Sequence, residues 1–324
     1  MVGLKNMNFN HSKLSPLKGD ASFRIFYRKK HKNSSSIIVC AKKEKIKNLL
    51  NYASINKILL KKKIFAPKLI SQNYKNNYIE IEDLGNKTLY EILKKNKKKE
   101  IFYNILKILV KLQKIKIKKI KNFNNKYYKI PNYSKNLLLK EANLFLEWYV
   151  PSIYKKKKYI INKKLKKIIK NLVNKLKLPN DTFVHRDFHV SNLMLNKKKI
   201  SIIDSQDAVY GNIAYDLASL IDDVRLKTSK KIKDLIYKKY FFFNRKKINK
   251  KNFKNDFEIL SVLRNLKIIG IFSRLSKRDN KNQYLKLIPH AWQLIELRTK
   301  DNNVFKDLKN NLEKNFSKKI RVMK

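Results

Sequence analysis

The sequence predicts an α+β fold in two lobes, the first small and built on an antiparallel sheet, the second larger and mainly helical. Short runs of alternating apolar and polar residues crowd residues 1–84, whereas apolar residues recur at three-and-four spacing from residue 88 onward. A hairpin pattern, two apolar runs around a polar turn, interrupts the helical part at residues 193–203. We therefore expect the lobes to comprise residues 1–84 and 85–324.

The hairpin gathers the polar residues that most strongly indicate a function. Residues 185–192 read H-R-D-F-H-V-S-N, and Asp204 follows the second strand of the hairpin. The hairpin should return Asp204 to the loop that carries Asp187 and Asn192. Phosphoryl transfer uses such a set, because one carboxylate accepts the proton of the attacking hydroxyl while an amide oxygen and a second carboxylate hold Mg²⁺ against the nucleotide phosphates.

The pattern H-R-D-x-x-x-x-N is the catalytic-loop signature of kinases, and Asp204 stands at the metal-binding position of the following hairpin. Ser205 and Gln206 come next instead of Phe-Gly, which indicates a kinase other than an ordinary protein kinase. We count Arg186 with Asp187 and Asn192 as catalytic. The alternative is a solvated loop before a hairpin, and the agreement of spacing, residue types and strands favours the kinase.

Three polar residues near the motif are expected to brace it. His185 and His189 lie within the motif, and histidines in such loops more often form hydrogen bonds than perform chemistry. Asp216 lies in the first turn of a helix expected at residues 214–224, where a carboxylate suits the helix dipole and can accept backbone N–H groups of the catalytic loop. All three are therefore predicted to be structural.

The first strands are expected within residues 14–27, joined by a turn at Gly19. The turn continues through Asp20, Ala21 and Ser22. A glycine turn can lay backbone N–H groups over a triphosphate. Alone the pattern describes an ordinary hairpin, but its position ahead of the catalytic stretch favours a nucleotide-binding turn.

The next strand, residues 36–41, ends at Lys42 and Lys43. Protein kinases place a phosphate-binding lysine on this strand, paired with a glutamate of the following helix. The expected helix, residues 46–60, contains no convincing glutamate partner. Either lysine could bind phosphate or simply be a solvated strand end.

A strand at residues 78–82 leads to Gly85 and to the end of the predicted small lobe. In a two-lobed kinase this segment becomes the hinge, where backbone groups near Glu82 and Leu84 bond the adenine edge. The alternative is an edge strand followed by a loop. The position of the segment in the chain favours the hinge.

Amphipathic helices are expected throughout the second lobe. The expected helices cover residues 89–93, 101–112, 137–149, 159–176 and 214–224, with three more near 228–243, 251–275 and 281–298. Basic residues recur near helical spacing in and just after the helix expected near residues 251–275: Arg264, Lys267, Arg274 and Arg278. They form either a basic face of the substrate cleft or a solvated surface, and the surface is favoured for most of them.

The formal net charge of +55 calls for nucleic acid as a partner, but the residue types argue against a dedicated site. Only 10 of the 79 basic residues are Arg, and the lysines are spread along the chain with abundant Asn and Ile, whose codons share A/T-rich composition. We expect nonspecific attraction to polyanions at low salt and no dedicated nucleic-acid site.

Cysteine content and hydropathy indicate the compartment. The single cysteine, Cys40, excludes a disulfide framework and fits a reducing cytoplasm. No apolar run is long enough for a signal peptide or a transmembrane helix. We expect a cytoplasmic protein, without a membrane partner and monomeric.

Segments over nearly the whole chain resemble one family. They read G-D-A-S-F-R at residues 19–24, E-D-L-G at 82–85, E-A-N-L-F-L-E-W-Y at 141–149, D-S-Q-D-A-V-Y-G at 204–211 and L-K-I-I-G-I-F-S-R-L-S-K-R-D at 266–279. With the catalytic motif, they resemble the aminoglycoside/choline phosphotransferase superfamily, which has a protein-kinase-like fold. The closest resemblance is to the bacterial N-acetylmuramate/N-acetylglucosamine anomeric kinases.

The resemblance implies ATP and Mg²⁺ as cofactors, and the anomeric hydroxyl of an amino sugar as the acceptor, for reuse of the sugar in peptidoglycan synthesis. It implies that Asp187 is the base and that Asn192 and Asp204 bind the metal. The residues that it places beside the substrate are Gln206, Asp207, Glu147 and Trp148.

The chain departs from the family pattern at two positions. Ser205 stands where an aromatic residue is more frequent, and Asn265 stands where a histidine is common. Neither change removes a group that the chemistry requires. The alternatives are a phosphotransferase for another acceptor, such as an aminoglycoside or choline, and a non-catalytic pseudokinase that binds polyanions.

Overall fold

The computed structural model describes residues 14–17, 24–41, 46–96, 98–244 and 248–322. The chain divides into two compact units. The first comprises residues 1–101, 114–131 and 190–209, and the second comprises residues 102–113, 132–189 and 210–324. The first unit thus contains the predicted small lobe and also the predicted hairpin. The lobe boundary between residues 84 and 85 stays a prediction.

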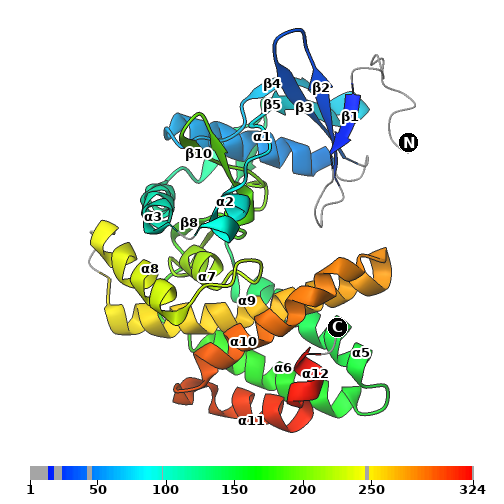
Figure 1. Ribbon diagram of the computed structural model, residues 1–324, viewed down its shortest axis with the longest axis vertical. Helices are drawn as coiled ribbons and strands as arrows, with labels where there is room; N and C mark the ends of the chain where they lie inside the picture. The colour runs from blue at the N-terminus through cyan, green and yellow to red at the C-terminus, as the bar shows by residue number, and fades with distance from the viewer. Residues whose placement is uncertain (1–13, 18–23, 42–45, 97, 245–247, 323–324) are drawn as a thin grey trace. The chain divides into compact units, whose positions relative to one another are not determined.

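A five-stranded antiparallel sheet forms the frame of the first unit, in the order β1-β2-β3-β5-β4 (Figure 1). In β3, alternation places Ile37 and Val39 on the face that forms the core and Ser36 and Ile38 on the opposite face. The strands are β1 (Leu14–Leu17), β2 (Ile25–Lys30), β3 (Ser35–Cys40), β4 (Leu69–Asn73) and β5 (Tyr78–Glu82).

Helix α1 (Ile46–Lys61) packs on the apolar face of this sheet. Leu49 and Tyr52, which are almost one helical turn apart, join Ile79 and Ile81 of β5 in one buried cluster. Apolar contact across this face removes large side chains from water, and this burial is the main stabilising contribution in such a layer. The helix predicted at residues 46–60 is therefore present.

The predicted hairpin is formed by β9 (Leu193–Asn196) and β10 (Lys199–Ile202), with Asn196 opposite Lys199. Lys197 and Lys198 both have positive φ, 44° and 62°, as a two-residue turn of the favoured hairpin type requires. The remaining elements of the unit are η3 (Tyr74–Asn76), α2 (Leu89–Lys95), η5 (Val190–Asn192) and the hairpin of β6 (Lys119–Lys121) and β7 (Tyr127–Lys129).

The second unit is mainly helical, and with the sheet of the first unit it confirms the predicted α+β class. Two short strands, β8 (Thr182–Val184) and β11 (Val209–Gly211), pair with each other. The helices are α3 (Lys99–Gln113), most of it in this unit, α4 (Lys135–Ala142), α5 (Val150–Ile153), α6 (Lys158–Asn174), α7 (Tyr215–Ile221), α8 (Lys230–Phe243), α9 (Lys250–Asp279), α10 (Ile288–Thr299), α11 (Lys306–Asn315) and α12 (Lys318–Val322). Short 3₁₀ segments, η6 (Asn282–Leu287) and η7 (Asn303–Phe305), flank α10.

The expectation of one regular helix over residues 137–149 is wrong. α4 ends at Ala142, and a π-helical turn, η4 (Phe145–Tyr149), follows it. The aromatic rings of Phe145 and Tyr149 stack with centroids 5.1 Å apart, and both pack against Trp292. Aromatic packing of this strength can hold a π-turn, which the three-and-four spacing of the sequence does not reveal.

The long helix α9 is the central element of the second unit. Most of its residues are buried, polar ones such as Asp256 and Arg264 among them, so the helix is enclosed around much of its circumference instead of along one stripe. At Gly270 the backbone of residues 144 and 145 approaches so closely that a Cβ atom would lie 2.5 Å from the Phe145 nitrogen. Glycine is therefore required at position 270, where α9 passes the backbone of residues 144 and 145. None of the helices in the described part of the chain is long and apolar enough to cross a membrane.

Candidate active site

The catalytic segment passes from one unit to the other between His189 and Val190. Asp187 therefore belongs to the second unit, while Asn192 and Asp204 belong to the first.

Asn192 and Asp204 are brought together by the β9–β10 hairpin. The carbonyl oxygen of Asn192 accepts a hydrogen bond from the Ile203 N–H at 3.0 Å. The two candidate metal ligands, Asn192 and Asp204, therefore lie close together at the same end of the hairpin. Asp204 has a φ of 63°, an uncommon conformation for a residue with a side chain. Such strained backbone is frequent where a side chain must be aimed at a ligand.

The carboxylate of Asp204 lies in a polar cluster of the first unit. Arg24 forms an ion pair with its Oδ1 atom, and the Gln206 amide donates to the same atom at 3.3 Å. The Gln206 amide also donates to Asp207 Oδ2 at 3.1 Å. The structure therefore places the predicted residues Asp204, Gln206 and Asp207 together, and it adds Arg24, which the sequence did not single out.

Ser205, where the chain departs from the family pattern, has a structural explanation. Its side chain is fully buried and its hydroxyl donates to Asn56 Oδ1 at 2.7 Å. Asn56 lies on α1, and its amide donates to the carbonyl oxygen of Pro67 at 3.1 Å. A small hydroxyl at this position thus ties the end of the hairpin to α1.

In the second unit, Asp216 holds the catalytic loop by its backbone. Its carboxylate accepts hydrogen bonds from the N–H groups of His185 at 2.7 Å and of Arg186 at 3.0 Å. These are the contacts expected of a bracing residue at this position. Burial raises the pKa of Asp216 to about 7, although both N–H donors act in the opposite direction.

Arg186 and Lys267 both bind one partly buried carboxylate. Glu141 of α4 accepts from Arg186 through Oε1 and pairs with the Lys267 ammonium through Oε2 at 3.0 Å. The Tyr133 hydroxyl also donates to Glu141, and it lies 3.1 Å from the Tyr215 hydroxyl. Although burial opposes it, the positive charges of Lys267 and Arg186 lower the pKa of Glu141 and keep it ionised.

Asp187 is partly buried and is ionised, and its charge interacts with the cations of this cluster. Burial alone would raise its pKa, but the positive charges of Lys267, Arg264 and Arg186 outweigh burial and hold the pKa well below its usual range. His189 adds little to this effect near pH 7, because burial and the Arg225 charge lower its own pKa to about 4. Asp187 is therefore a carboxylate that accepts hydrogen bonds readily and is a weak base.

The sequence expectation for the basic residues of α9 is wrong at two positions. Arg264 is only 4% exposed and the Lys267 side chain 11%, so neither is part of a solvated surface. Their spacing on the helix is the same for an exposed stripe and for a buried cluster. The buried carboxylate that pairs with Lys267 is 126 residues away in the sequence, which no local pattern reveals.

The remaining residues predicted beside the substrate, Glu147 and Trp148, lie in the π-helical turn. Glu147 is exposed and Trp148 is partly buried. His185 and His189 are both buried, and the ring of His185 packs edge-on to Phe188 with centroids 6.2 Å apart. A packed ring of this kind suits the predicted bracing role, which stays a prediction.

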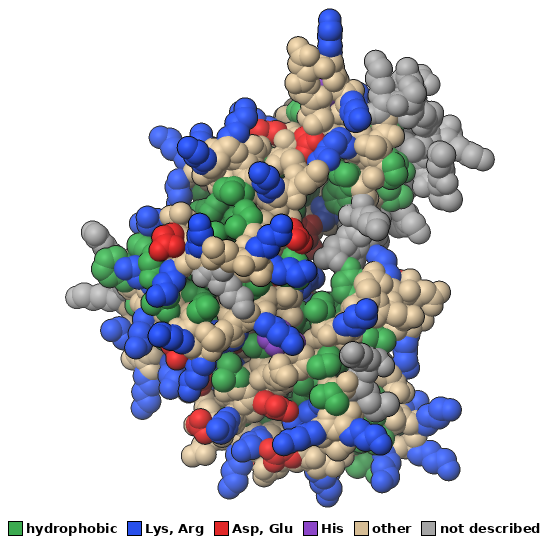
Figure 2. Space-filling model, viewed as in Figure 1, with side chains coloured by type: hydrophobic (Ala, Val, Ile, Leu, Met, Phe, Trp, Pro, Cys, Tyr) green, Lys and Arg blue, Asp and Glu red, His purple; other side chains and the backbone are tan. Residues whose placement is uncertain are grey.

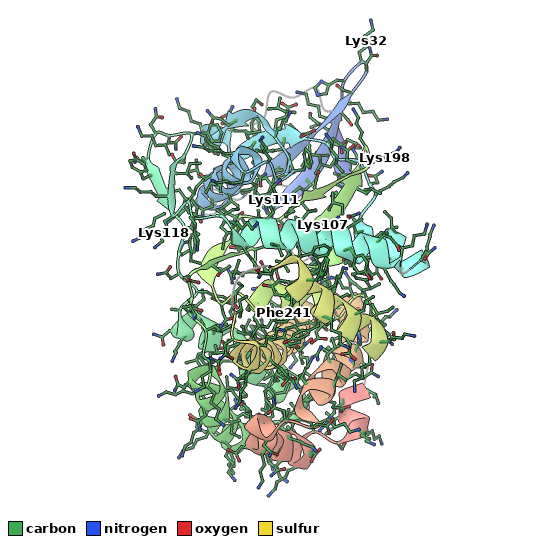
Figure 3. The ribbon with its side chains drawn as sticks, turned by 90° about the vertical axis from the view of Figure 1, so that its left-hand side faces the viewer. Lys32, Lys107, Lys111, Lys118, Lys198 and Phe241 are labelled. Carbon is green, nitrogen blue, oxygen red and sulfur yellow. The ribbon has the colours of Figure 1, made fainter. Side chains whose placement is uncertain are left out.

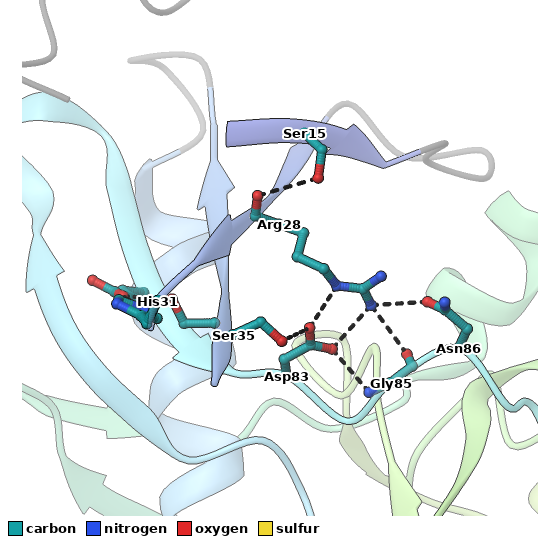
Figure 4. A network of polar contacts seen from close by, with 9 residues as sticks. Ser15, Arg28, His31, Ser35, Asp83, Gly85 and Asn86 are labelled. Carbon is teal, nitrogen blue, oxygen red and sulfur yellow. Dashed lines mark hydrogen bonds and ion pairs between the residues drawn. The ribbon is translucent and has the colours of Figure 1, made fainter. Parts of the chain in front are cut away.

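The predicted hinge segment is rigidly held in the first unit (Figure 4). Arg28 of β2 binds Asp83 with both ends of its guanidinium, at 2.5 and 3.0 Å, and the Ser35 hydroxyl donates to the same carboxylate at 2.7 Å. Asp83 in turn accepts from the Gly85 N–H at 2.8 Å, where φ is 81°. The network lowers the pKa of Asp83 in spite of burial.

Of the residues predicted to bind the nucleotide, the structure describes Glu82 and Leu84. The Glu82 carboxylate accepts a hydrogen bond from the Lys68 N–H at 3.3 Å, and the Glu82 N–H donates to the Lys68 carbonyl oxygen at 2.9 Å. Leu84 is buried. The Asp83 network therefore fixes the backbone of Glu82 and Leu84, the residues expected to meet adenine. The other predicted nucleotide-binding residues, Gly19, Asp20, Ala21 and Ser22, lie outside the described residues, as do Lys42 and Lys43.

Oxygen donors of the first unit suit Mg²⁺. In the described residues, no group of three or more His, Cys, Asp and Glu side chains is arranged to hold a metal ion. Mg²⁺ does not need such a group, because it is usually held by one or two carboxylates together with substrate phosphates and water. Asp204 and Asn192, adjacent at the end of the hairpin, match that hard-oxygen chemistry.

Basic side chains are scattered over the visible face of the molecule and do not gather in one patch (Figure 2). The lysines marked in Figure 3 come from different elements: Lys32 from the β2–β3 turn, Lys107 and Lys111 from α3, Lys118 from the segment before β6, and Lys198 from the β9–β10 turn. The labelled lysines therefore come from several elements and not from one, and the attraction to polyanions stays a prediction.

The fold resembles those of small-molecule kinases. The structure of the gentamicin–APH(2'')-IIa complex covers 90% of this chain and 95% of its own, with a TM-score of 0.63 and 15% identity. The Plasmodium vivax ethanolamine kinase covers 91% of this chain and 85% of its own, with a TM-score of 0.58 and 16% identity. At these identities the likeness concerns the fold, which is the predicted kinase-like fold.

A comparison with protein-family models identifies the chain as a phosphotransferase. The model of the phosphotransferase enzyme family matches residues 13–245, and the chain belongs to that family. It is accordingly an ATP-dependent kinase.

Two relatives match the chain over most of its length. One is an N-acetylmuramate/N-acetylglucosamine kinase of Pseudomonas aeruginosa, 25% identical over 88% of this chain and 83% of the relative. The other, of the same name, is from Neisseria meningitidis serogroup B and is 28% identical over 83% of this chain and 80% of the relative.

Proposed function

We propose that this protein transfers the terminal phosphate of ATP to the anomeric hydroxyl of N-acetylmuramate or N-acetylglucosamine. Two relatives of that name match more than four-fifths of the chain, and the match is not limited to the catalytic motif. In this proposal residues 1–84 bind the nucleotide and residues 85–324 bind the sugar. The enzyme acts as a cytoplasmic monomer, which its single buried cysteine suits.

The observation that carries the proposal is the charge environment of Asp187. The positive charges of Lys267, Arg264 and Arg186 keep its pKa low, so this carboxylate can orient a hydroxyl but is a poor acceptor for the proton of an ordinary alcohol. An anomeric hydroxyl is more acidic than other sugar hydroxyls. In a loose phosphoryl-transfer transition state the proton leaves late, so an orienting carboxylate of low basicity is sufficient for such an acceptor.

Each residue then has a defined role. Asp187 accepts the hydrogen bond of the sugar hydroxyl, aims its oxygen at the terminal phosphorus and takes the proton as the new bond forms. Arg186, fixed by Glu141, holds the loop that carries Asp187. Asp204 and Asn192 would hold Mg²⁺, which when bound neutralises charge on the phosphates.

Residues of the first unit complete the nucleotide site in this proposal. Gly19, Asp20, Ala21 and Ser22 cover the phosphates with backbone N–H groups, and the backbone at Glu82 and Leu84 bonds the adenine edge. Gln206 and Asp207 lie beside the metal and the sugar. In the second unit, Glu147 and Trp148 face the sugar ring.

The experiment is ATP consumption with Mg²⁺ against N-acetylmuramate, N-acetylglucosamine, choline and kanamycin. Turnover is expected on the two acetylated sugars and should disappear when the anomeric hydroxyl is methylated. Asp187→Ala should abolish turnover while leaving nucleotide binding intact, and Asp181→Ala, an exposed aspartate six residues earlier, serves as the control. More than a tenth of the turnover in Asp187→Ala would contradict the assigned role, and turnover on choline or kanamycin alone would contradict the proposed acceptor.

A further inference from the structure

We infer that Arg24 binds the terminal phosphates of the nucleotide, in place of the strand lysine on which protein kinases rely. The inference rests on the proposed use of ATP but not on the identity of the sugar. It assigns a phosphate-binding role to a residue that also contacts the candidate metal ligand Asp204.

The contacts of Arg24 place its guanidinium at the metal site of the first unit. Nη2 forms an ion pair with Asp204 Oδ1, and Nη1 donates to Gln206 Oε1 at 3.0 Å. The Arg24 side chain is 4% exposed, whereas that of Asp204 is 35% exposed. The Arg24 guanidinium thus contacts Asp204 from the protein interior, and the Asp204 carboxylate remains partly exposed to solvent.

Two aromatic rings hold the guanidinium in position. Its central carbon lies 5.5 Å from the ring centroid of Phe26 on β2 and 5.6 Å from that of Tyr52 on α1. Cation–π contacts at these distances partly replace the hydration that a buried cation loses. Burial raises the pKa of Tyr52 to about 12, so the phenol is neutral and its ring remains the contact surface.

The usual phosphate-binding pair is missing from the described residues of the same region. Protein kinases place a lysine on the third strand and a glutamate on the following helix. Residues 35–41 contain no lysine, and Ala41 takes part in the inward-facing core next to Val39. Residues 46–61 of α1 contain no acidic residue. Arg24 supplies the buried cation here, and Tyr52 occupies the helix side of the arrangement.

A guanidinium suits this position better than an ammonium. Its planar fork binds two oxygen atoms at once, it stacks on aromatic rings, and it stays charged when buried. The metal-binding aspartate of a kinase lies next to the nucleotide phosphates, because the metal ion bridges them. A fork that spans Asp204 and Gln206 is therefore within reach of the same phosphate oxygens.

The test is a set of binding measurements by calorimetry, with adenosine, ADP and ATP, each without metal and with Mg²⁺, and without sugar. Arg24→Gln should weaken metal-free ATP binding by about 10- to 100-fold, which is the loss of a charge-assisted hydrogen bond, and should leave adenosine binding within twofold. Arg24→Lys keeps the charge but not the planar fork. Its affinity for metal-free ATP should lie between that of Arg24→Gln and that of the unaltered protein. Lys29→Gln, on the strand that follows Arg24, is the control for loss of a cation, because its partner is Glu80 and not Asp204; it should leave metal-free ATP binding within twofold.

A purely structural role for Arg24 predicts different nucleotide affinities. If Arg24 only positions Asp204, Arg24→Gln will bind metal-free ATP as tightly as the unaltered protein does and will lose affinity only with Mg²⁺. That result overturns the inference. Should Arg24→Gln fail to fold, equal metal-free ATP affinity of Arg24→Lys and the unaltered protein would overturn it. Nucleotide binding without turnover of any amino sugar would contradict the proposed function alone, and absence of all nucleotide binding would contradict both.

Discussion

Replacement of Glu141 by glutamine probes the link between the buried ion cluster and catalysis. Glu141 is 12% exposed in its side chain and neutralises two cations at once, Arg186 through one oxygen and Lys267 through the other. Glutamine keeps the shape and one acceptor but removes the charge. Both cations would then remain buried, with Asp187 as the nearest carboxylate to share them.

The magnitude follows from the burial of all three partners. Removing one member of a buried ion pair costs about 3 to 5 kcal/mol, because the other charge is left uncompensated. Two cations depend on Glu141, so we expect the upper half of that range. Arg186 precedes Asp187 directly, and its release together with the stronger positive field at Asp187 should lower turnover at least about tenfold, or roughly 1.4 kcal/mol.

The assay combines urea unfolding with steady-state kinetics at a temperature where the variant is fully folded. Glu313→Gln is the matched control, since Glu313 lies on α11 of the same unit, is exposed and has no role in the proposed site. It should change stability by less than about 0.5 kcal/mol. A loss of less than 1 kcal/mol in Glu141→Gln, with unchanged turnover, would refute the reasoning.

Other substitutions test the packing and electrostatics of the second unit. Gly270→Ala should destabilise the protein by about 2 kcal/mol, because the methyl group meets the backbone of Phe145 and the overlap outweighs the gain in helix propensity of about 1 kcal/mol; a stabilised variant would contradict the close approach. Asp222→Asn should cost about 3 to 5 kcal/mol at pH 7, since Lys233 and Arg298 both lie within 3.0 Å of the buried Asp222 carboxylate. These cations lower the pKa of Asp222 although burial opposes them, so its stabilising contribution is complete above the unfolded value of about 3.9 and is lost as the pH falls through the folded value. In acid titrations of unfolding, Asp222→Asn should therefore show a shallower loss of stability below pH 4 than the unaltered protein, and identical slopes would contradict this assignment.

The sequence predicts well the parts of the fold that depend on local periodicity. Alternation located β3 and β5, three-and-four spacing located α1, and the polar turn located the β9–β10 hairpin. The spacing of Asp187, Asn192 and Asp204 indicated phosphoryl transfer because the motif and the hairpin are contiguous in the chain.

Contacts between distant segments could not be predicted in this way. Arg24 meets Asp204 across 180 residues, and Lys267 meets Glu141 across 126. A local pattern cannot distinguish a buried arginine with a remote partner from an exposed one. The π-helical turn after α4 was missed for a similar reason, because aromatic packing against Trp292 stabilises it.

The most direct test of the proposed function is to locate the phosphate on the product formed from N-acetylmuramate. After incubation with ATP and Mg²⁺, phosphorus NMR of the purified product should show one new phosphate, coupled to the anomeric proton of the sugar. Its formation should depend on Asp187. A phosphate on any other hydroxyl, or no phosphorylated sugar from a protein that binds ATP, would contradict the proposal.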